Sequence, residues 1–93
     1  MSIIVLGEED LVDLFNTLGI DGIVTNDPDS MLANIRKNRK EKKYEVIMIS
    51  GKLASKCRKE INEIEFEKKG PLVIEIPNHV GEDSELKLNL MKF

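Results

Sequence analysis

The 93-residue sequence has few of the side chains that support covalent or metal chemistry. It contains one cysteine, Cys57, one histidine, His79, and no tryptophan. A single cysteine excludes an internal disulfide, so a reducing compartment is the simplest assumption. Because Cys57 falls on an apolar helix face, we expect a buried thiol. No second nitrogen or sulfur ligand lies near His79 in the sequence, so we expect a surface histidine.

Long apolar runs and an excess of positive charge are also missing. No apolar stretch approaches the roughly 20 residues needed to cross a bilayer. No basic segment followed by an apolar one opens the chain, so we expect neither a secretory signal nor direct membrane insertion. The formal net charge of −3 disfavours a nucleic-acid partner, because phosphate binding needs net or clustered positive charge. We therefore expect a cytoplasmic protein.

The sequence does contain a regular alternation of short apolar runs with helix-like segments. Hydrophobic residues make up 41% and charged residues 33%, a composition typical of one globular domain. Runs at 2–6, 45–49 and 72–76 are rich in Val, Ile and Leu, as in parallel strands buried on both faces. A weaker run lies at 23–25. We predict an α/β fold, a small doubly wound (Rossmann-like or receiver-like) four-stranded parallel sheet with flanking helices and strand order 2-1-3-4.

Three helices are expected between these strands. The first should begin in the acidic turn after Gly7 and end near Gly19. The second should have Asp27 as its N-cap and Pro28 at its first position, and Ser50 should cap the third. Apolar residues recur at helical spacing and predict the buried faces. These residues are Leu11, Leu14, Phe15, Leu18, Met31, Leu32, Ile35, Leu53, Ala54, Cys57, Ile61 and Ile64, with Phe66 expected to pack below the exit of the third helix.

The chain is expected to divide into an α/β domain over residues 1–77 and a linker with a C-terminal tail over 78–93. The tail is ambiguous, because its leucines alternate as in a strand while some apolar residues also match a helix face. Five large apolar residues among the last eight are too many for a free terminus, so the tail either folds back or docks on another chain. The candidate partner-interface residues are Leu86, Leu90, Met91 and Phe93, with Leu88 in the same segment.

An acidic cluster, Glu8, Glu9 and Asp10, follows the first strand. In open α/β sheets this carboxyl edge is where ligands bind, and receiver domains place metal-binding carboxylates there. A receiver also needs a phosphoacceptor aspartate at the end of the third strand, where this chain has Ser50. Three carboxylates would also repel a pyrophosphate. We favour stabilisation of the first helix dipole, and we expect no catalytic residues, no metal site and no cofactor.

A basic run lies at the end of the second predicted helix. A solvated helix end is the favoured interpretation, since cations suit the negative end of the dipole. The alternative is a contact with an acidic patch on a protein partner. No aromatic residue is interleaved for base stacking, which disfavours single-stranded nucleic acid. The run contains Arg36, Lys37, Arg39, Lys40, Lys42 and Lys43.

In this order and spacing, the segments resemble the F subunit of the prokaryotic and archaeal V-type (A-type) rotary ATPases. Each motif is weak by itself, but the ordered set in a chain of this length is fairly specific. The resemblance runs from about residue 3 to residue 77. It rests on the Ile-Val-Leu-Gly opening with its acidic turn, on Gly19-Ile20, and on the segments 26–29, 46–50 and 71–77.

The resemblance implies a non-catalytic part of the central rotor shaft that binds the long coiled coil of the D subunit. Through the D subunit it would be connected to the A/B catalytic head and to the membrane sector, where protons or sodium ions cross. ATP synthesis or hydrolysis in that family occurs on other subunits, so the resemblance implies a cytoplasmic protein peripheral to the membrane. The family usually continues through a longer C-terminal helix, whereas a short tail follows Asp83 here.

Two other functions are compatible with the residues. One is a degenerate receiver-like signalling module that binds a protein partner without phosphorylation. The other is a binder of a small molecule at the carboxyl edge of the sheet. Copurification with the D subunit separates the rotor part from the signalling module, and thermal shifts with nucleotides and divalent metals test the small-molecule binder.

Overall fold

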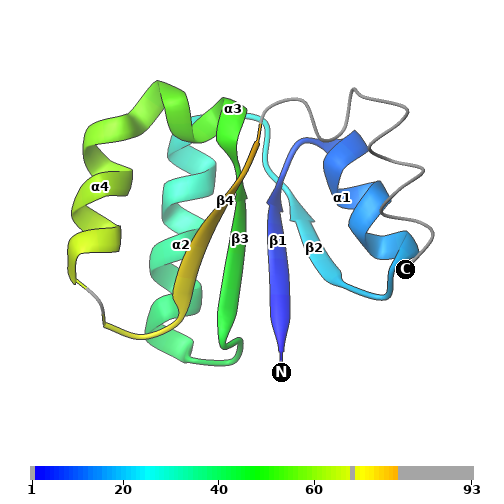
Figure 1. Ribbon diagram of the computed structural model, residues 1–93, viewed down its shortest axis with the longest axis horizontal. Coiled ribbons are helices and arrows are strands. Elements are labelled where there is room, and N and C mark those ends of the chain that lie inside the picture. Colours follow the sequence, from blue (N-terminus) through cyan, green and yellow to red (C-terminus); the bar gives the residue numbers. More distant parts are fainter. Residues whose placement is uncertain (1, 68, 78–93) are drawn as a thin grey trace.

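The computed structural model describes residues 2–67 and 69–77. Four strands form one parallel sheet in the order β2-β1-β3-β4, as the sequence predicts. The two central strands carry the most buried side chains, because both contribute residues to the apolar clusters on the two faces of the sheet. The strands are β1 (Ile3–Gly7), β2 (Asp21–Val24), β3 (Val46–Ser50) and β4 (Leu72–Ile76) (Figure 1).

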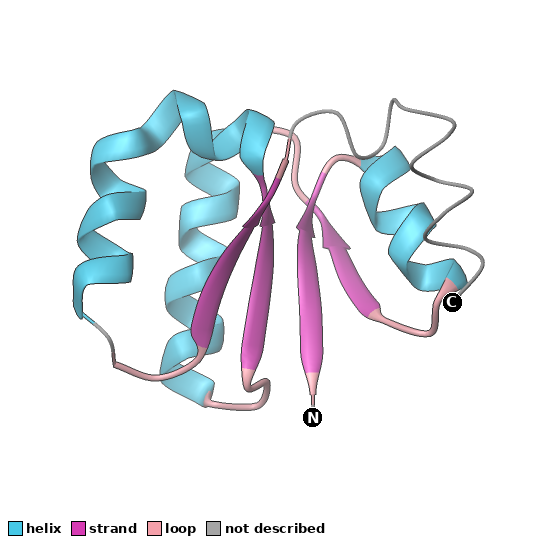
Figure 2. Cartoon of the chain, viewed as in Figure 1, coloured by secondary structure: helices cyan, strands magenta, loops and turns pink. Residues whose placement is uncertain are grey.

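Helices lie on both faces of this sheet, which confirms the doubly wound arrangement. Of the described helices, α1 (Glu9–Thr17) is the one that packs on the first face. The other face carries α2 (Pro28–Glu41), α3 (Gly51–Ala54) and α4 (Arg58–Glu67). Figure 2 shows the uneven result, with one short helix on one side of the sheet and most of the helical residues on the other.

Local signals set the helix ends where the sequence places them. The Asp27 carboxylate accepts a hydrogen bond from the Ser30 backbone N–H at 2.8 Å, and Pro28 occupies the first helical position of α2. The Ser50 hydroxyl accepts from the Leu53 N–H at 3.2 Å at the start of α3. Gly19 follows α1 with φ of +81°, a conformation that suits glycine.

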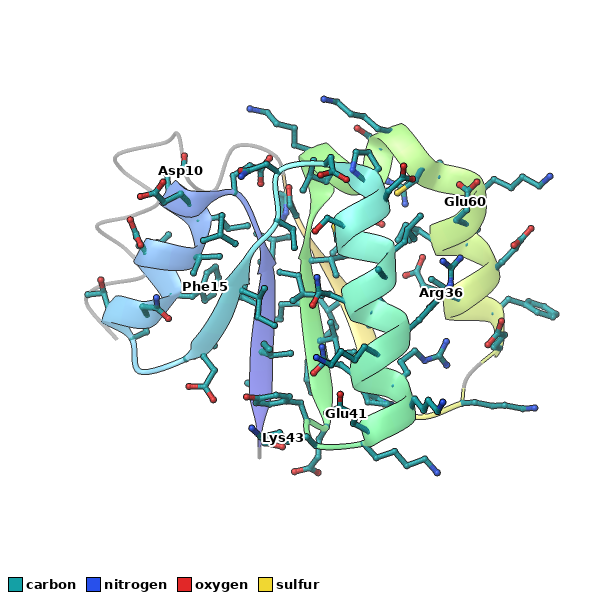
Figure 3. All side chains as sticks on the ribbon, turned by 180° about the vertical axis from the view of Figure 1, so that it is seen from behind. Asp10, Phe15, Arg36, Glu41, Lys43 and Glu60 are labelled. Carbon is teal, nitrogen blue, oxygen red and sulfur yellow. The ribbon has the colours of Figure 1, made fainter. Side chains whose placement is uncertain are left out.

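Two apolar clusters fill the faces of the sheet. The larger lies under α2, α3 and α4, where Ile47 and Ile49 of β3 are fully buried, as predicted for the third strand. The smaller lies under α1, where Phe15 is directed towards the sheet (Figure 3). A Cβ on Gly22 would come within 2.7 Å of Val12 and 2.9 Å of Val5. The absence of a side chain there lets α1 approach β2 closely.

Three sequence expectations differ from the structure. The third helix is interrupted by a 3-10 turn, Ser55–Cys57, although its apolar stripe stays buried. Phe66 does not pack below the helix exit, because it is 85% exposed on α4. Leu18 is 38% exposed, since α1 ends at Thr17 and Leu18 is its C-cap.

Candidate interaction surfaces

The carboxyl edge of the sheet holds the acidic cluster. Glu9 and Asp10 are exposed in the first turn of α1, where the helix dipole favours negative charge. The Asp10 carboxylate accepts from the adjacent Leu11 N–H at 2.9 Å, and its side chain lies on the outer side of α1 (Figure 3). Over residues 2–67 and 69–77, no group of three or more histidine, cysteine or acidic side chains is placed to hold a metal ion.

Cys57 is buried in the larger core, as its position on the apolar face predicts. Its thiol donates to the Leu53 carbonyl at 3.5 Å, and burial raises the pKa of the Cys57 thiol above its ordinary value. A raised pKa keeps the group as the neutral thiol, which is a poor nucleophile. The cysteine is therefore a small core residue.

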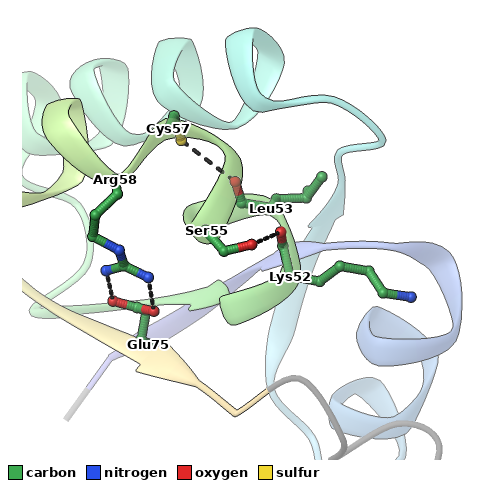
Figure 4. A network of polar contacts seen from close by, with 6 residues as sticks. All are labelled: Lys52, Leu53, Ser55, Cys57, Arg58 and Glu75. Atoms are coloured by element: carbon green, nitrogen blue, oxygen red, sulfur yellow. Dashed lines mark hydrogen bonds and ion pairs between the residues drawn. The ribbon is translucent and has the colours of Figure 1, made fainter.

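A bidentate ion pair joins α4 to the edge strand β4. Arg58 donates from its two terminal nitrogens to the Glu75 carboxylate at 2.5 and 2.7 Å (Figure 4). The hydrogen bonds from Arg58 lower the pKa of the Glu75 carboxyl. Both side chains are partly exposed, so this is a surface ion pair that connects the helix to the strand.

The sheet has an uncovered apolar strip beside α1. Alternation along β4 points Leu72, Ile74 and Ile76 to the face that carries α1, but of these three only Ile76 is buried in the cluster under α1. Leu72 is 61% exposed and Ile74 is 41% exposed. Met48, the partner of Ile74 in the β3–β4 register, is partly buried beside them. We call Met48, Leu72 and Ile74 the open strip.

Arg39 builds a second surface on the opposite side of the start of β4. Its side chain is only 12% exposed and reaches from α2 to the segment that follows α4. One terminal nitrogen donates to the Ile64 carbonyl at 3.2 Å and to Glu67 at 3.4 Å, and the other donates to the Lys69 carbonyl. The buried Nε of Arg39 has no partner among the described residues. Arg39 thus fixes the loop between α4 and β4 against α2.

A hollow of about 600 Å³ opens over this contact. Gly70 sits at its rim with φ of +76°, and a Cβ there would lie 3.4 Å from the Arg39 carbonyl oxygen, so glycine suits the turn. Arg36 lies on the side of α2 that faces α4 (Figure 3). We call the cationic lining of this site the basic hollow. It consists of Arg36, Arg39, Lys40, Lys42 and Lys69, with Glu67 as the one acidic side chain that lines it.

The structure gathers some of the sequence candidates and separates others. Four cations of the basic run line the hollow, whereas Lys37 lies 4.0 Å from Glu41 and Lys43 lies over the Tyr44 ring. Lys69 joins the hollow from a distant part of the chain, and no local pattern points to it. His79 and the four tail candidates Leu86, Leu90, Met91 and Phe93 lie outside the described residues.

Comparison with known families supplies the context for these surfaces. A family model described as the ATP synthase (F/14-kDa) subunit matches residues 3–92, nearly the whole chain. The chain belongs to this family. The match confirms the resemblance to the F subunit of the V-type and A-type ATPases.

Membership in the F-subunit family makes the protein a component of a rotary ATPase, an ion-transporting complex that makes or hydrolyses ATP. No curated protein matches the sequence. Across the part of the chain that the structure describes, no helix is both long enough and apolar enough to span a membrane.

Proposed function

We propose that the chain is a non-catalytic component of the central rotor stalk, held in place by the D subunit. In this role it couples ATP hydrolysis or synthesis in the A/B head to proton or sodium transport in the membrane sector. It makes no membrane insertion of its own and stays on the cytoplasmic side as a peripheral part of the complex. Family membership supports the stalk role, and the open strip supports the contact with a helical partner.

The open strip is the observation on which the contact with the D subunit rests. A parallel sheet is normally covered on both faces, because its strands are apolar on both sides. In this protein the β3–β4 half of one face exposes Leu72 and Ile74 instead. A helix laid beside α1 would bury these side chains and complete the layer, which is the shape a coiled-coil partner offers.

The C-terminal tail is proposed to add to that contact. We expect residues 1–77 to form the folded domain and residues 78–93 to form a linker and an apolar segment that becomes ordered by packing. A helix of two to three turns is too short to be stable alone. The side chains proposed to reach the D subunit are Leu86, Leu90, Met91 and Phe93.

The non-catalytic role is supported by the chemistry of the described residues. The Ser50 hydroxyl caps α3, the Cys57 thiol is buried, and residues 2–67 and 69–77 contain no group of three or more histidine, cysteine or acidic side chains placed to hold a metal ion. The sequence has no glycine-rich phosphate loop followed by lysine. A rigid domain with exposed contact surfaces is what a rotor part needs.

Copurification with the D subunit tests the proposal. The full chain should bind the D subunit, and Ile74→Lys should weaken binding by at least about tenfold, since it puts a charge in an apolar contact. Phe66→Lys is the matched control, because it removes an exposed apolar side chain from the far face. If the wild-type chain fails to bind the D subunit, the proposed stalk role is wrong.

Truncation tests the tail separately. A chain lacking residues 84–93 should keep a cooperative unfolding transition and should bind the D subunit more weakly. Equal affinities of the truncated and full chains would remove the tail from the interface. Weaker binding of Ile74→Lys would then leave the open strip as the surface that grips the shaft.

A further inference from the structure

We infer that the basic hollow is a second docking site, one that receives an acidic segment of another protein of the complex. The inference rests on the proposed stalk role, which supplies the complex in which the partner is found. It adds a surface on the other side of the start of β4 from the open strip. The ligand chemistry is a cluster of aspartate and glutamate carboxylates.

The first support is the imbalance of charge in the hollow. Five cationic side chains line it against one carboxylate, although the whole chain has a formal net charge of −3. The one carboxylate, Glu67, is paired with Arg39. No acidic partner is found for the other four cations among the described residues. Those four are Arg36, Lys40, Lys42 and Lys69.

The second support is that the helix dipole does not account for the site. Cations in the last turn of α2 are favoured by the negative end of the dipole, which explains Arg39 and Lys40. Lys69 belongs to the loop after α4, and it is brought to the hollow by the Arg39 contact with its carbonyl and by the turn at Gly70. The tertiary fold therefore adds positive charge where α2 already has an excess.

The third observation is that Arg39, below the exposed cations, holds the two sides of the hollow together. Arg39 is nearly buried, and its guanidinium donates hydrogen bonds to the Ile64 and Lys69 carbonyls and to Glu67. It therefore positions the loop, while the exposed cations around it remain available to a partner. Because Arg39 holds the backbone of Lys69 against α2, the cations from the two segments lie around one hollow before a partner binds, which favours a defined contact.

A short acidic protein segment fits this site better than an extended polyanion. The field of the hollow is local, because the Debye length at physiological salt is about 8 Å. A nucleic acid or an anionic membrane would also meet the rest of a chain with net negative charge. Arginine and lysine together bind carboxylates well, and the described lining includes no aromatic side chain for base stacking.

Reversal of two charges tests the inference in an ATPase complex depleted of its F subunit and supplied with the purified full chain. The hollow variant carries Lys40→Glu and Lys69→Glu. The matched control carries Lys56→Glu and Lys59→Glu, with the same change in net charge; these two exposed lysines lie in the 3-10 turn before α4 and in the first turn of α4. At an ionic strength of about 0.05 M, the hollow variant should bind at least about tenfold more weakly than the control.

Salt dependence separates an electrostatic contact from damage to the fold. Near 1 M salt, where the Debye length is about 3 Å, the two variants should bind with similar affinity. The neutral variant, Lys40→Gln with Lys69→Gln, should lie between the wild type and the hollow variant. Equal melting temperatures of the hollow and control variants would show that both are folded.

Three results can be told apart. If the wild-type chain does not join the depleted complex, the stalk role fails before the hollow is tested. If it joins but the hollow and control variants bind equally at low salt, the hollow is not a docking site. Binding of the wild-type chain to phosphatidylserine vesicles or to single-stranded DNA, lost in the hollow variant alone, would overturn the inference in favour of a phosphate ligand.

Discussion

Individual side chains on the same strand differ widely in what they contribute to stability. In β3, Ile47 and Ile49 are fully buried in the larger core, whereas Met48 between them points to the half-open face. In β4, the exposed Ile74 lies between the buried or partly buried residues that face α4. Successive side chains of β4 therefore point to opposite faces of the sheet, and the face decides whether an apolar residue is buried in the larger core or lies on the side of α1.

Ile47→Ala should lower the free energy of unfolding by roughly 2–5 kcal/mol, because it removes buried methyl groups and leaves a cavity in a fully packed site. Urea denaturation followed by circular dichroism measures the change. Ile74→Ala is the internal control, since the side chain is 41% exposed and should cost less than about 1 kcal/mol. A midpoint unchanged by Ile47→Ala would contradict the central position of β3.

At the scale of elements, the edge strand β4 is held by one neighbouring strand and by contacts from the helices on one face. It pairs with β3 along its whole length, and the Arg58–Glu75 ion pair connects its C-terminal end to α4. Arg39 connects the loop that precedes the N-terminal end of β4 to α2. These side-chain contacts fasten both ends of a strand that has no second strand beside it among the described elements.

The Arg58–Glu75 contact should make stability depend on pH in a defined direction. The pKa of Glu75 is lowered in the folded protein below the ordinary value of 4.5, so the contact stabilises the fold above that value. Its contribution should disappear as the pH falls through the lowered folded-state pKa. Glu75→Gln should therefore destabilise the protein at pH 7, with a difference from wild type that shrinks once the pH falls below the ordinary pKa of 4.5.

Chemical denaturation of both proteins from pH 7 down to the acid limit measures this difference. Glu63→Gln is the control, because Glu63 is exposed on α4, the helix that carries Arg58, and has no ion pair among the described contacts. A pH-independent difference between wild type and Glu75→Gln would mean that the charge of Glu75 does not contribute to the stability of the fold.

Helix caps and strand order were predictable from the sequence because their causes are local. Asp27 with Pro28, and Ser50 before an apolar stripe, specify helix starts within a few residues. Right-handed crossovers then leave few arrangements of four parallel strands. The 3-10 turn at Ser55–Cys57 was missed, since it keeps the same apolar stripe as a continuous helix.

The interaction surfaces were less predictable because they depend on tertiary placement. The basic run was visible, but Lys69 reaches the hollow only through the fold of the α4–β4 loop. The open strip could not be predicted from the sequence, since an apolar strand does not indicate whether a helix covers it. Phe66 was wrongly expected to be buried for the same reason, because its face of α4 has no described neighbour to cover it.

At the scale of the whole molecule, the helices are distributed unevenly around the sheet. Among the described elements, one face is covered by α2, α3 and α4, and the other only in part by α1 (Figure 1). The open strip and the basic hollow lie on either side of the start of β4, so both proposed contacts meet near one corner of the domain. A rotor part gripped at two surfaces of different chemistry resists rotation about either one.

The purified chain should not hydrolyse ATP, because the proposed role is structural and the sequence has no glycine-rich phosphate loop followed by lysine. Phosphate release from ATP with Mg²⁺ should stay at the level of buffer alone. Activity that follows the pure protein through several columns would overturn the non-catalytic role. Addition of the chain to the depleted ATPase should instead change the number of ions transported per ATP hydrolysed.

The position of β1 has a consequence for how the protein is made. This strand is synthesised first and yet lies inside the sheet, with β2 on one edge and β3 on the other. The β2 edge can be paired after residue 24, but the β3 edge has no partner until Ser50 has left the ribosome. For that interval the nascent chain presents an apolar strand with unpaired backbone groups, the form most open to pairing with another chain. The arrival of β3 thus pairs the second edge of β1 and moves the free edge to β3, which stays unpaired until β4 follows.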